Sequence, residues 1–132
     1  MLTHDHVTDW ADAYRSAWEN ADAAAASDLF SKTSSYRSNI YEEPYLGRAG
    51  VQEYWSGVTA AQTDVRVRMG EPVVLGQKSI VEFWTTMSVD GQPVTLAGCL
   101  MLNFEDSGLC SALREYWNFE SGTHHPPAGW GV

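Results

Sequence analysis

The sequence predicts a single α+β domain over residues 1–132, with helices in its first half and antiparallel strands in its second. In the first half, apolar residues recur every three or four positions, as in a helix that buries one face. From Val65 onward the apolar residues alternate, as in strands with one buried face. The segments LGQK, DG and EDSG interrupt this alternation and are typical of hairpin turns.

Three helices are expected in the first half. The first has one apolar stripe, formed by Val7, Trp10, Ala11, Tyr14, Ala17 and Trp18. Asp22 is placed to cap a short second helix, AAAASDLF, which should end near Phe30. An extended segment, SSYRSNI, and a loop, YEEPYLG, follow, because Pro44 and Gly47 interrupt regular structure. Helical spacing then returns in GRAGVQEYWSGV, the expected third helix.

Four long antiparallel strands are expected in the second half, at about 65–74, 79–89, 93–104 and 109–119. A two-residue turn at DG pairs Phe83 with Gly98, and a four-residue turn at EDSG pairs Leu100 with Leu113. With these registers, the four strands share one face that should meet the helices. That inward face includes Phe83, Thr85, Met87, Gly98, Leu100, Leu113, Glu115 and Trp117.

Glu115, in the segment LREYWNF, is a carboxylate among apolar residues on this inward face. The register places it opposite Gly98, which would leave room beside it. Arg114 cannot be its partner, because adjacent strand residues point in opposite directions. Burial raises the pKa of a carboxyl group, so Glu115 is a candidate acid or base near neutral pH. The alternative is a structural carboxylate bonded to Tyr14, Trp18 or a tail histidine.

The opposite face of the strands is too apolar for a sheet surface that meets only water. It carries Trp84, Cys99, Met101 and Tyr116. We therefore expect a homodimer that buries this face.

Charge and composition narrow the classes of partner and location. The net charge is −9 and no run of Lys or Arg occurs, which argues against nucleic acid or an anionic membrane as the main partner. No stretch approaches the roughly 20 apolar residues of a membrane span. The N-terminal MLTHDHVTDW lacks the features of a signal peptide, so a cytoplasmic location is expected. Cys99 and Cys110 lie too far apart on the predicted ladder to form a disulfide.

No metal or cofactor is expected. The four histidines form two pairs, His4 with His6 and His124 with His125. Neither pair is accompanied by further potential ligands at the spacing that a metal site needs. The C-terminal segment HHPPAGWG, within residues 124–132, contains two prolines that stiffen it and a tryptophan, Trp130, that could dock. This tail is a candidate lid over a binding site.

Several segments together resemble the SnoaL-like branch of the nuclear transport factor 2-like superfamily. They are the aromatic first helix with Tyr14, ADAAAASDLF, GRAGVQEYW and the closing LREYWNF. The resemblance implies a cone-shaped, curved antiparallel or mixed sheet wrapped around three N-terminal helices, with an interior pocket and usually a dimer. Its members include polyketide cyclases, ketosteroid isomerases, epoxide hydrolases and proteins of no known activity, so the fold alone does not choose a function.

The functional residues of these relatives match this sequence only in part. The oxyanion-binding tyrosine of ketosteroid isomerases corresponds to Tyr14, but their two aspartates correspond to Ser38 and Leu100. Limonene-type epoxide hydrolases use an Asp–Arg–Asp set, and no arginine lies on the inward face. Polyketide cyclases keep an acid on the final strand, a role that Glu115 would fill.

These observations predict a pocket for a small hydrophobic, carbonyl-bearing molecule. The expected chemistry is cofactor-free proton transfer (isomerisation, cyclisation or dehydration), with Glu115 as base and Tyr14 as hydrogen-bond donor. The residues expected to line the pocket are Trp18, Tyr36, Ser38, Trp55, Phe83, Thr85, Met87, Gly98, Leu100, Leu113 and Trp117.

Two alternatives stay open, a non-catalytic ligand-binding protein and a dimeric interaction domain whose cone is filled by its own side chains. An open cavity of roughly 300 Å³ or more would favour a ligand, whereas a packed interior would favour the interaction domain.

Overall fold

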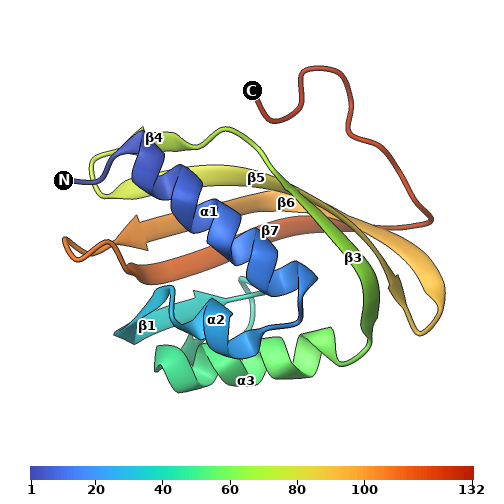
Figure 1. Cartoon of the computed structure of the whole chain (residues 1–132), viewed down its shortest axis with the longest axis horizontal. Helices are drawn as coiled ribbons and strands as arrows, with labels where there is room; N and C mark the ends of the chain where they lie inside the picture. The colour runs from blue at the N-terminus through green and yellow to red at the C-terminus, as the bar shows by residue number, and fades with distance from the viewer.

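Three helices lie against the concave face of one curved sheet in the computed structural model, which describes residues 1–132 (Figure 1). The helices are α1 (His4–Glu19), α2 (Ala23–Ser27) and α3 (Gly47–Thr59). The strands are β1 (Phe30–Arg37), β2 (Tyr45–Leu46), β3 (Gln62–Met69), β4 (Val73–Leu75), β5 (Lys78–Val89), β6 (Gln92–Phe104) and β7 (Cys110–Ser121).

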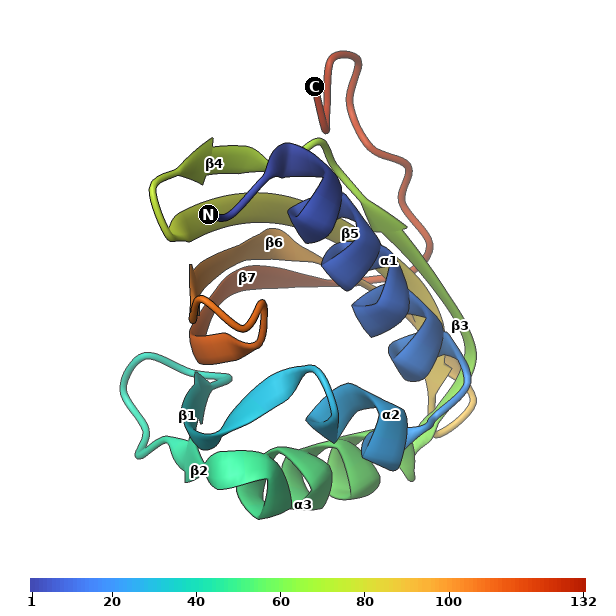
Figure 2. The same ribbon diagram turned by 60° about the vertical axis from the view of Figure 1, so that its left-hand side comes forward.

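The sheet is mixed and follows the order β2-β1-β7-β6-β5-β3, with β4 paired to β5. The β1–β7 pair is parallel, and the other pairs are antiparallel. Figure 2 shows the sheet curving around α1, while α2 and α3 close the other side. The predicted α+β cone with three N-terminal helices is confirmed.

Local sequence signals explain the helices. Thr3 caps α1 by accepting a hydrogen bond from the backbone N–H of His6. Asp22 caps α2, as the sequence predicted, by accepting one from the backbone N–H of Ala25. All six residues of the predicted apolar stripe on α1 are buried. Helix α3 buries Val51. None of the three helices combines the length and apolarity needed to cross a membrane.

The first half differs from expectation around β1. Helix α2 ends at Ser27, so Phe30 begins β1 instead of closing the helix, and β1 is longer than the expected extended segment. The expected loop YEEPYLG contains β2, whose two residues pair with Ser35 and Tyr36 of β1. Both differences arise from pairing with distant chain segments, which local patterns do not reveal.

The expected strand at about 65–74 is two strands, because residues 70–72 between β3 and β4 are not in strand conformation. Pro72 has no N–H to donate to a sheet. Gly70 lies against the C-terminal tail, where an added Cβ would come 2.9 Å from the Cα of Gly131. The break therefore lets the tail pass close to the end of β3.

The register between β5 and β6 is the predicted one, but the register between β6 and β7 differs by two residues. Phe83 pairs with Gly98, as expected. Glu115, however, pairs with Leu100 instead of Gly98, and Gly98 pairs with Trp117. One residue of the shift comes from a longer turn and the other from an irregularity next to Phe104. A two-residue shift preserves which face each side chain occupies, so Glu115 still points inward.

Gly98 serves a different purpose from the one predicted. An added Cβ would come 2.0 Å from the backbone oxygen of Tyr116 and 2.7 Å from the Cα of Trp117. The glycine thus permits β6 and β7 to approach closely and does not make space for the Glu115 side chain.

Aromatic rings fill the space between the helices and the sheet. Trp10 stacks on Tyr14 with ring centroids 5.3 Å apart, and Trp18 meets Trp55 edge-on at the same separation. Both cysteines are free.

The C-terminal tail folds back over the sheet face that points away from the helices, here called the outer face (Figure 1). The indole N–H of Trp84 donates to the backbone oxygen of His124 at 2.9 Å, and Trp130 packs edge-on against Trp84 with ring centroids 6.0 Å apart. The backbone N–H of Glu71 donates to the oxygen of Gly131 at 2.7 Å. These contacts hold the tail against the outer face.

Candidate functional site

Glu115 lies inside the cone, where three elements bring two tyrosines to its carboxylate. It is 7% exposed on the inner face of β7, Tyr36 comes from the adjacent β1, and Tyr14 comes from α1. Tyr36 donates a hydrogen bond from its hydroxyl to Oε1 of Glu115. Tyr14 donates to the same oxygen at 3.3 Å, and the two hydroxyl oxygens are 2.8 Å apart. Of the partners considered from the sequence, Tyr14 is the one that contacts Glu115.

Burial has the largest effect on the pKa values of Glu115, Tyr14 and Tyr36. It raises the pKa of Glu115 to about 7, while hydrogen bonds from Tyr36 and Tyr14 lower it by less. Burial, together with the negative charge of Glu115, raises the pKa of both tyrosines well above their usual range. The tyrosines therefore remain neutral donors, and Glu115 is the group that titrates near neutral pH.

Packing holds the two tyrosine rings in place. Tyr14 meets Trp55 edge-on with ring centroids 5.5 Å apart, in addition to its stacking on Trp10. The ring of Tyr36 lies 4.8 Å from that of Tyr54. Since both hydroxyls are held by buried rings, Oε1 of Glu115 occupies a defined position.

The second carboxylate oxygen of Glu115 is free of protein partners. Both hydrogen bonds end on Oε1, and Oε2 is not one of the polar atoms sealed in the interior without a partner. Oε2 is therefore the atom of the cluster that is left for solvent or a ligand.

Most residues that the sequence predicted to line an interior pocket are packed in the core. Those that are buried are Trp18, Tyr36, Trp55, Phe83, Thr85, Met87, Leu100 and Leu113. Trp117 is 42% exposed at the rim, and its indole N–H donates to the backbone oxygen of half-buried Ser38 at 2.6 Å. The centre of the cone is thus filled largely by the protein's own side chains.

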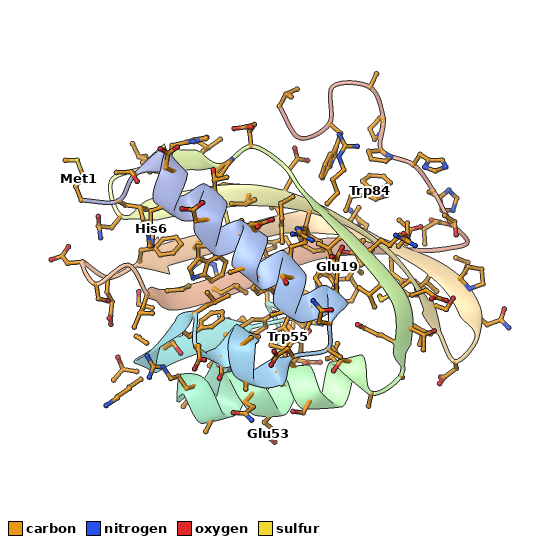
Figure 3. The ribbon with its side chains drawn as sticks, in the orientation of Figure 1. Met1, His6, Glu19, Glu53, Trp55 and Trp84 are labelled. Carbon is orange, nitrogen blue, oxygen red and sulfur yellow. The ribbon has the colours of Figure 1, made fainter.

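A cavity of about 700 Å³ lies elsewhere, between the outer face, the tail and the loop after β1. We call it the outer groove, and its lining residues are Asn39, Ile40, Tyr41, Glu82, Trp84, Ala97, Gly98, Cys99, Glu115, Tyr116, Trp117, Asn118, Pro127 and Trp130. Glu115 belongs both to the tyrosine cluster and to this lining. Figure 3 shows Trp84 beside the tail, whereas Trp55 lies among the helices.

Sequence reasoning missed the outer groove as a site. Of the residues predicted for the pocket, it contains Gly98, Glu115 and Trp117. The one indication in the sequence is that Ile40 and Tyr41 are apolar although they lie in a loop. No sequence pattern predicts that this loop lies close to the C-terminal tail. The structure contains no group of three or more His, Cys, Asp or Glu side chains placed to hold a metal ion.

Comparisons with known proteins agree with this fold. Among solved structures, a hypothetical protein with a ketosteroid isomerase-like fold from Catenulispora acidiphila, in complex with trimethylamine, has a TM-score of 0.74 at 18% identity, covering 87% of this chain and 86% of that one. The epoxide hydrolase/cyclase-like enzyme SalBIII, with a role in pyran ring formation in the polyether salinomycin, has a TM-score of 0.77 at 16% identity, covering 89% and 95%. Rv0760c from Mycobacterium tuberculosis has a TM-score of 0.76 at 13% identity, covering 92% and 100%.

These low identities establish a shared fold and nothing finer. No curated protein matches the sequence significantly. The family model of the SnoaL-like domain matches residues 11–112, which is most of the chain. With its cone fold and this match, the chain belongs to the SnoaL-like domain family.

Proposed function

We propose that this chain binds a small hydrophobic carbonyl compound and catalyses a cofactor-free proton transfer at Glu115. The reaction class is isomerisation, cyclisation or dehydration. The observation that carries the proposal is a buried carboxyl group with a pKa of about 7, held at one oxygen by two tyrosine hydroxyls and unpartnered at the other. A group that titrates near the working pH is suited to accept and return protons.

In the proposed reaction, ionised Glu115 removes a proton from the carbon next to the carbonyl group. The proton moves to Oε2, and the electron pair of the broken C–H bond moves toward the carbonyl oxygen. Tyr36 keeps Oε1 in place. Tyr14, whose bond to Oε1 is long at 3.3 Å, is the hydroxyl that turns to donate to the developing enolate oxygen. The same proton is then returned to another atom of the ligand.

We propose that the ligand approaches Oε2 from the outer groove, whose lining includes Glu115, and extends past Glu115 to the buried hydroxyl of Tyr14. The volume of about 700 Å³ exceeds what a small ligand needs. The part that SalBIII plays in pyran ring formation agrees with a cyclisation among the proposed reactions.

Hydrogen exchange tests the chemistry without knowledge of the natural substrate. A panel of small cyclic and aryl ketones is incubated with the protein in D₂O, and deuterium incorporation next to the carbonyl is followed by NMR. We expect Glu115→Gln to lower the exchange rate about a hundredfold or more. Glu53→Gln, which changes an exposed acid on α3, is the matched control and should leave the rate unchanged. An equal rate in wild type and Glu115→Gln would refute the role of Glu115.

The packed cone favours a second candidate, a non-catalytic domain that acts as a homodimer. Part of the predicted outer-face interface is occupied by the chain itself, because the tail covers Trp84. Apolar side chains gather instead near β4, where Leu75 is 80% exposed. With Val73, Ile80 and Met101 it lines a cavity of about 260 Å³. We propose this end of the outer face as the dimer contact.

Sedimentation equilibrium tests the dimer. Wild type should sediment as a dimer, and Leu75→Glu should shift it toward monomer. Gln52→Glu, on the exposed side of α3, should not. A monomeric wild-type protein at micromolar concentration would contradict the interface. The two free cysteines fit the cytoplasmic location that we propose, because a reducing compartment keeps thiols unpaired.

A further inference from the structure

We propose that the outer groove is a binding site for a small organic cation, a protonated or quaternary ammonium compound with apolar substituents. The inference concerns binding alone and does not depend on proton transfer at Glu115. Three observations support it: the charge of the residues that line the groove, the aromatic rings among them, and the tail residues that form one side of the groove.

The lining has a negative charge and no positive one. It contains the exposed carboxylate of Glu82 and no Lys, Arg or His; Glu115 also belongs to the lining, but its carboxyl group points into the cone. Glu82 is exposed on the outer face of β5. The whole chain carries a net charge of −9, so the surrounding field also disfavours anions. The charge complement of this groove is therefore a cation.

Five aromatic residues surround the same space, and they come from distant parts of the chain. They are Tyr41, Trp84, Tyr116, Trp117 and Trp130. Tyr41 is 95% exposed, and Tyr116 and Trp117 are each 42% exposed. The faces of Trp and Tyr rings attract ammonium groups, and their apolar area suits the alkyl substituents of such a ligand. The rings and the Glu82 carboxylate together favour an organic cation over an anion or a bare metal ion.

The tail supplies one wall through Trp130 and Pro127. Its position is fixed partly by the backbone N–H of Gly131, which donates to a carboxylate oxygen of Glu82 at 3.3 Å. Arg68, from β3 and outside the lining, already lies 5.2 Å from the centroid of the Trp130 ring. This contact places a protein cation beside Trp130, so Tyr41, Trp84, Tyr116 and Trp117 present the rings left for the ammonium group, while Trp130 contributes apolar wall.

Choline and 3,3-dimethylbutan-1-ol form a matched pair of probes, because they share a shape and differ in charge. Calorimetry at low ionic strength should give a choline affinity at least about fivefold higher than that of the neutral alcohol. NMR should place the choline methyl protons near indole protons. Glu82→Gln should lower choline affinity about threefold or more and leave the affinity for the alcohol unchanged. Glu53→Gln, on α3 away from Trp84 (Figure 3), is the control and should change neither.

A second variant tests the aromatic wall. Trp130→Ala should weaken choline binding, and Trp130→Phe should retain most of it; circular dichroism checks that each variant is folded. If Trp130→Ala does not fold, the Glu82→Gln comparison decides.

Equal affinity for choline and the alcohol, unchanged choline affinity in Glu82→Gln, or no choline binding at millimolar concentration would each overturn the inference. Choline binding without ketone exchange would leave this inference standing and remove the proposed catalysis, and exchange without choline binding would do the reverse.

Discussion

Glu115 is accommodated in the core by hydroxyl groups and not by a cation. A basic partner would lower the pKa of a buried carboxylate, and neutral donors lower it too; at Glu115 the effect of burial exceeds that of the two hydroxyl hydrogen bonds. Tyr14 and Tyr36 bond one of its oxygens, and burial raises its pKa to about 7. Strand parity in the sequence was enough to predict that Glu115 faces inward and that Arg114 does not pair with it. The contact with Tyr36 depends on the parallel β1–β7 pair, which no local pattern indicates.

The raised pKa has a consequence for stability. The group is protonated up to about pH 7 in the folded state but ionises near its ordinary value when unfolded. The folded state therefore binds more protons, so stability falls as the pH rises through this window. Relative to Glu115→Gln, the wild type should lose about 3 kcal/mol of unfolding free energy between pH 4 and pH 8. Urea denaturation of both proteins across this range measures the difference. Parallel pH profiles for the two proteins would contradict it.

At the scale of elements, the β6–β7 pair shows that the sequence predicts which face a side chain occupies better than it predicts the strand register. Alternation predicted that Leu113 and Glu115 of β7 face inward, and this survives a register error of two, whereas Cys110, expected opposite Asn103, is buried in the core. The predicted register assumed a four-residue turn at EDSG. The structure has a longer turn there and an irregularity beside Phe104, and together they shift the register by two residues. Turn length and bulges depend on the packing of both strands, so composition alone did not determine them.

Gly98 provides a prediction at this scale. Gly98→Ala would place a Cβ 2.0 Å from the backbone oxygen of Tyr116, so β6 and β7 must separate. We expect a loss of roughly 2–4 kcal/mol in unfolding free energy. Gly57→Ala, in α3, meets nothing within 4 Å and should instead stabilise the protein by about 0.5–1 kcal/mol. Thermal denaturation of both variants measures the contrast, and a neutral Gly98→Ala would mean that the strands are not held so closely.

At the scale of the whole molecule, the helices and strands were predictable because their signals are local and periodic, and the resemblance to the SnoaL-like family implied the cone. The sequence did not predict which inward-facing residues are packed in the core or where the cavity lies. The cone centre is filled by residues that a ligand would otherwise contact, such as Phe83 and Leu100. The outer groove combines a loop, a sheet face and a tail that are far apart in the chain. Such a cavity exists only once the chain is folded.

The central claim is that Glu115 is a carboxyl group tuned by burial to exchange protons near neutral pH. Carbon-13 NMR titration of the Glu115 side-chain carboxyl measures this directly. We predict a midpoint near pH 7 in the wild type, and a higher one in Tyr36→Phe, because that change removes a hydrogen bond that lowers the pKa. Tyr41→Phe, which alters an exposed hydroxyl, should leave the midpoint unchanged. A wild-type midpoint near the ordinary glutamate value of about 4.3 would contradict the account.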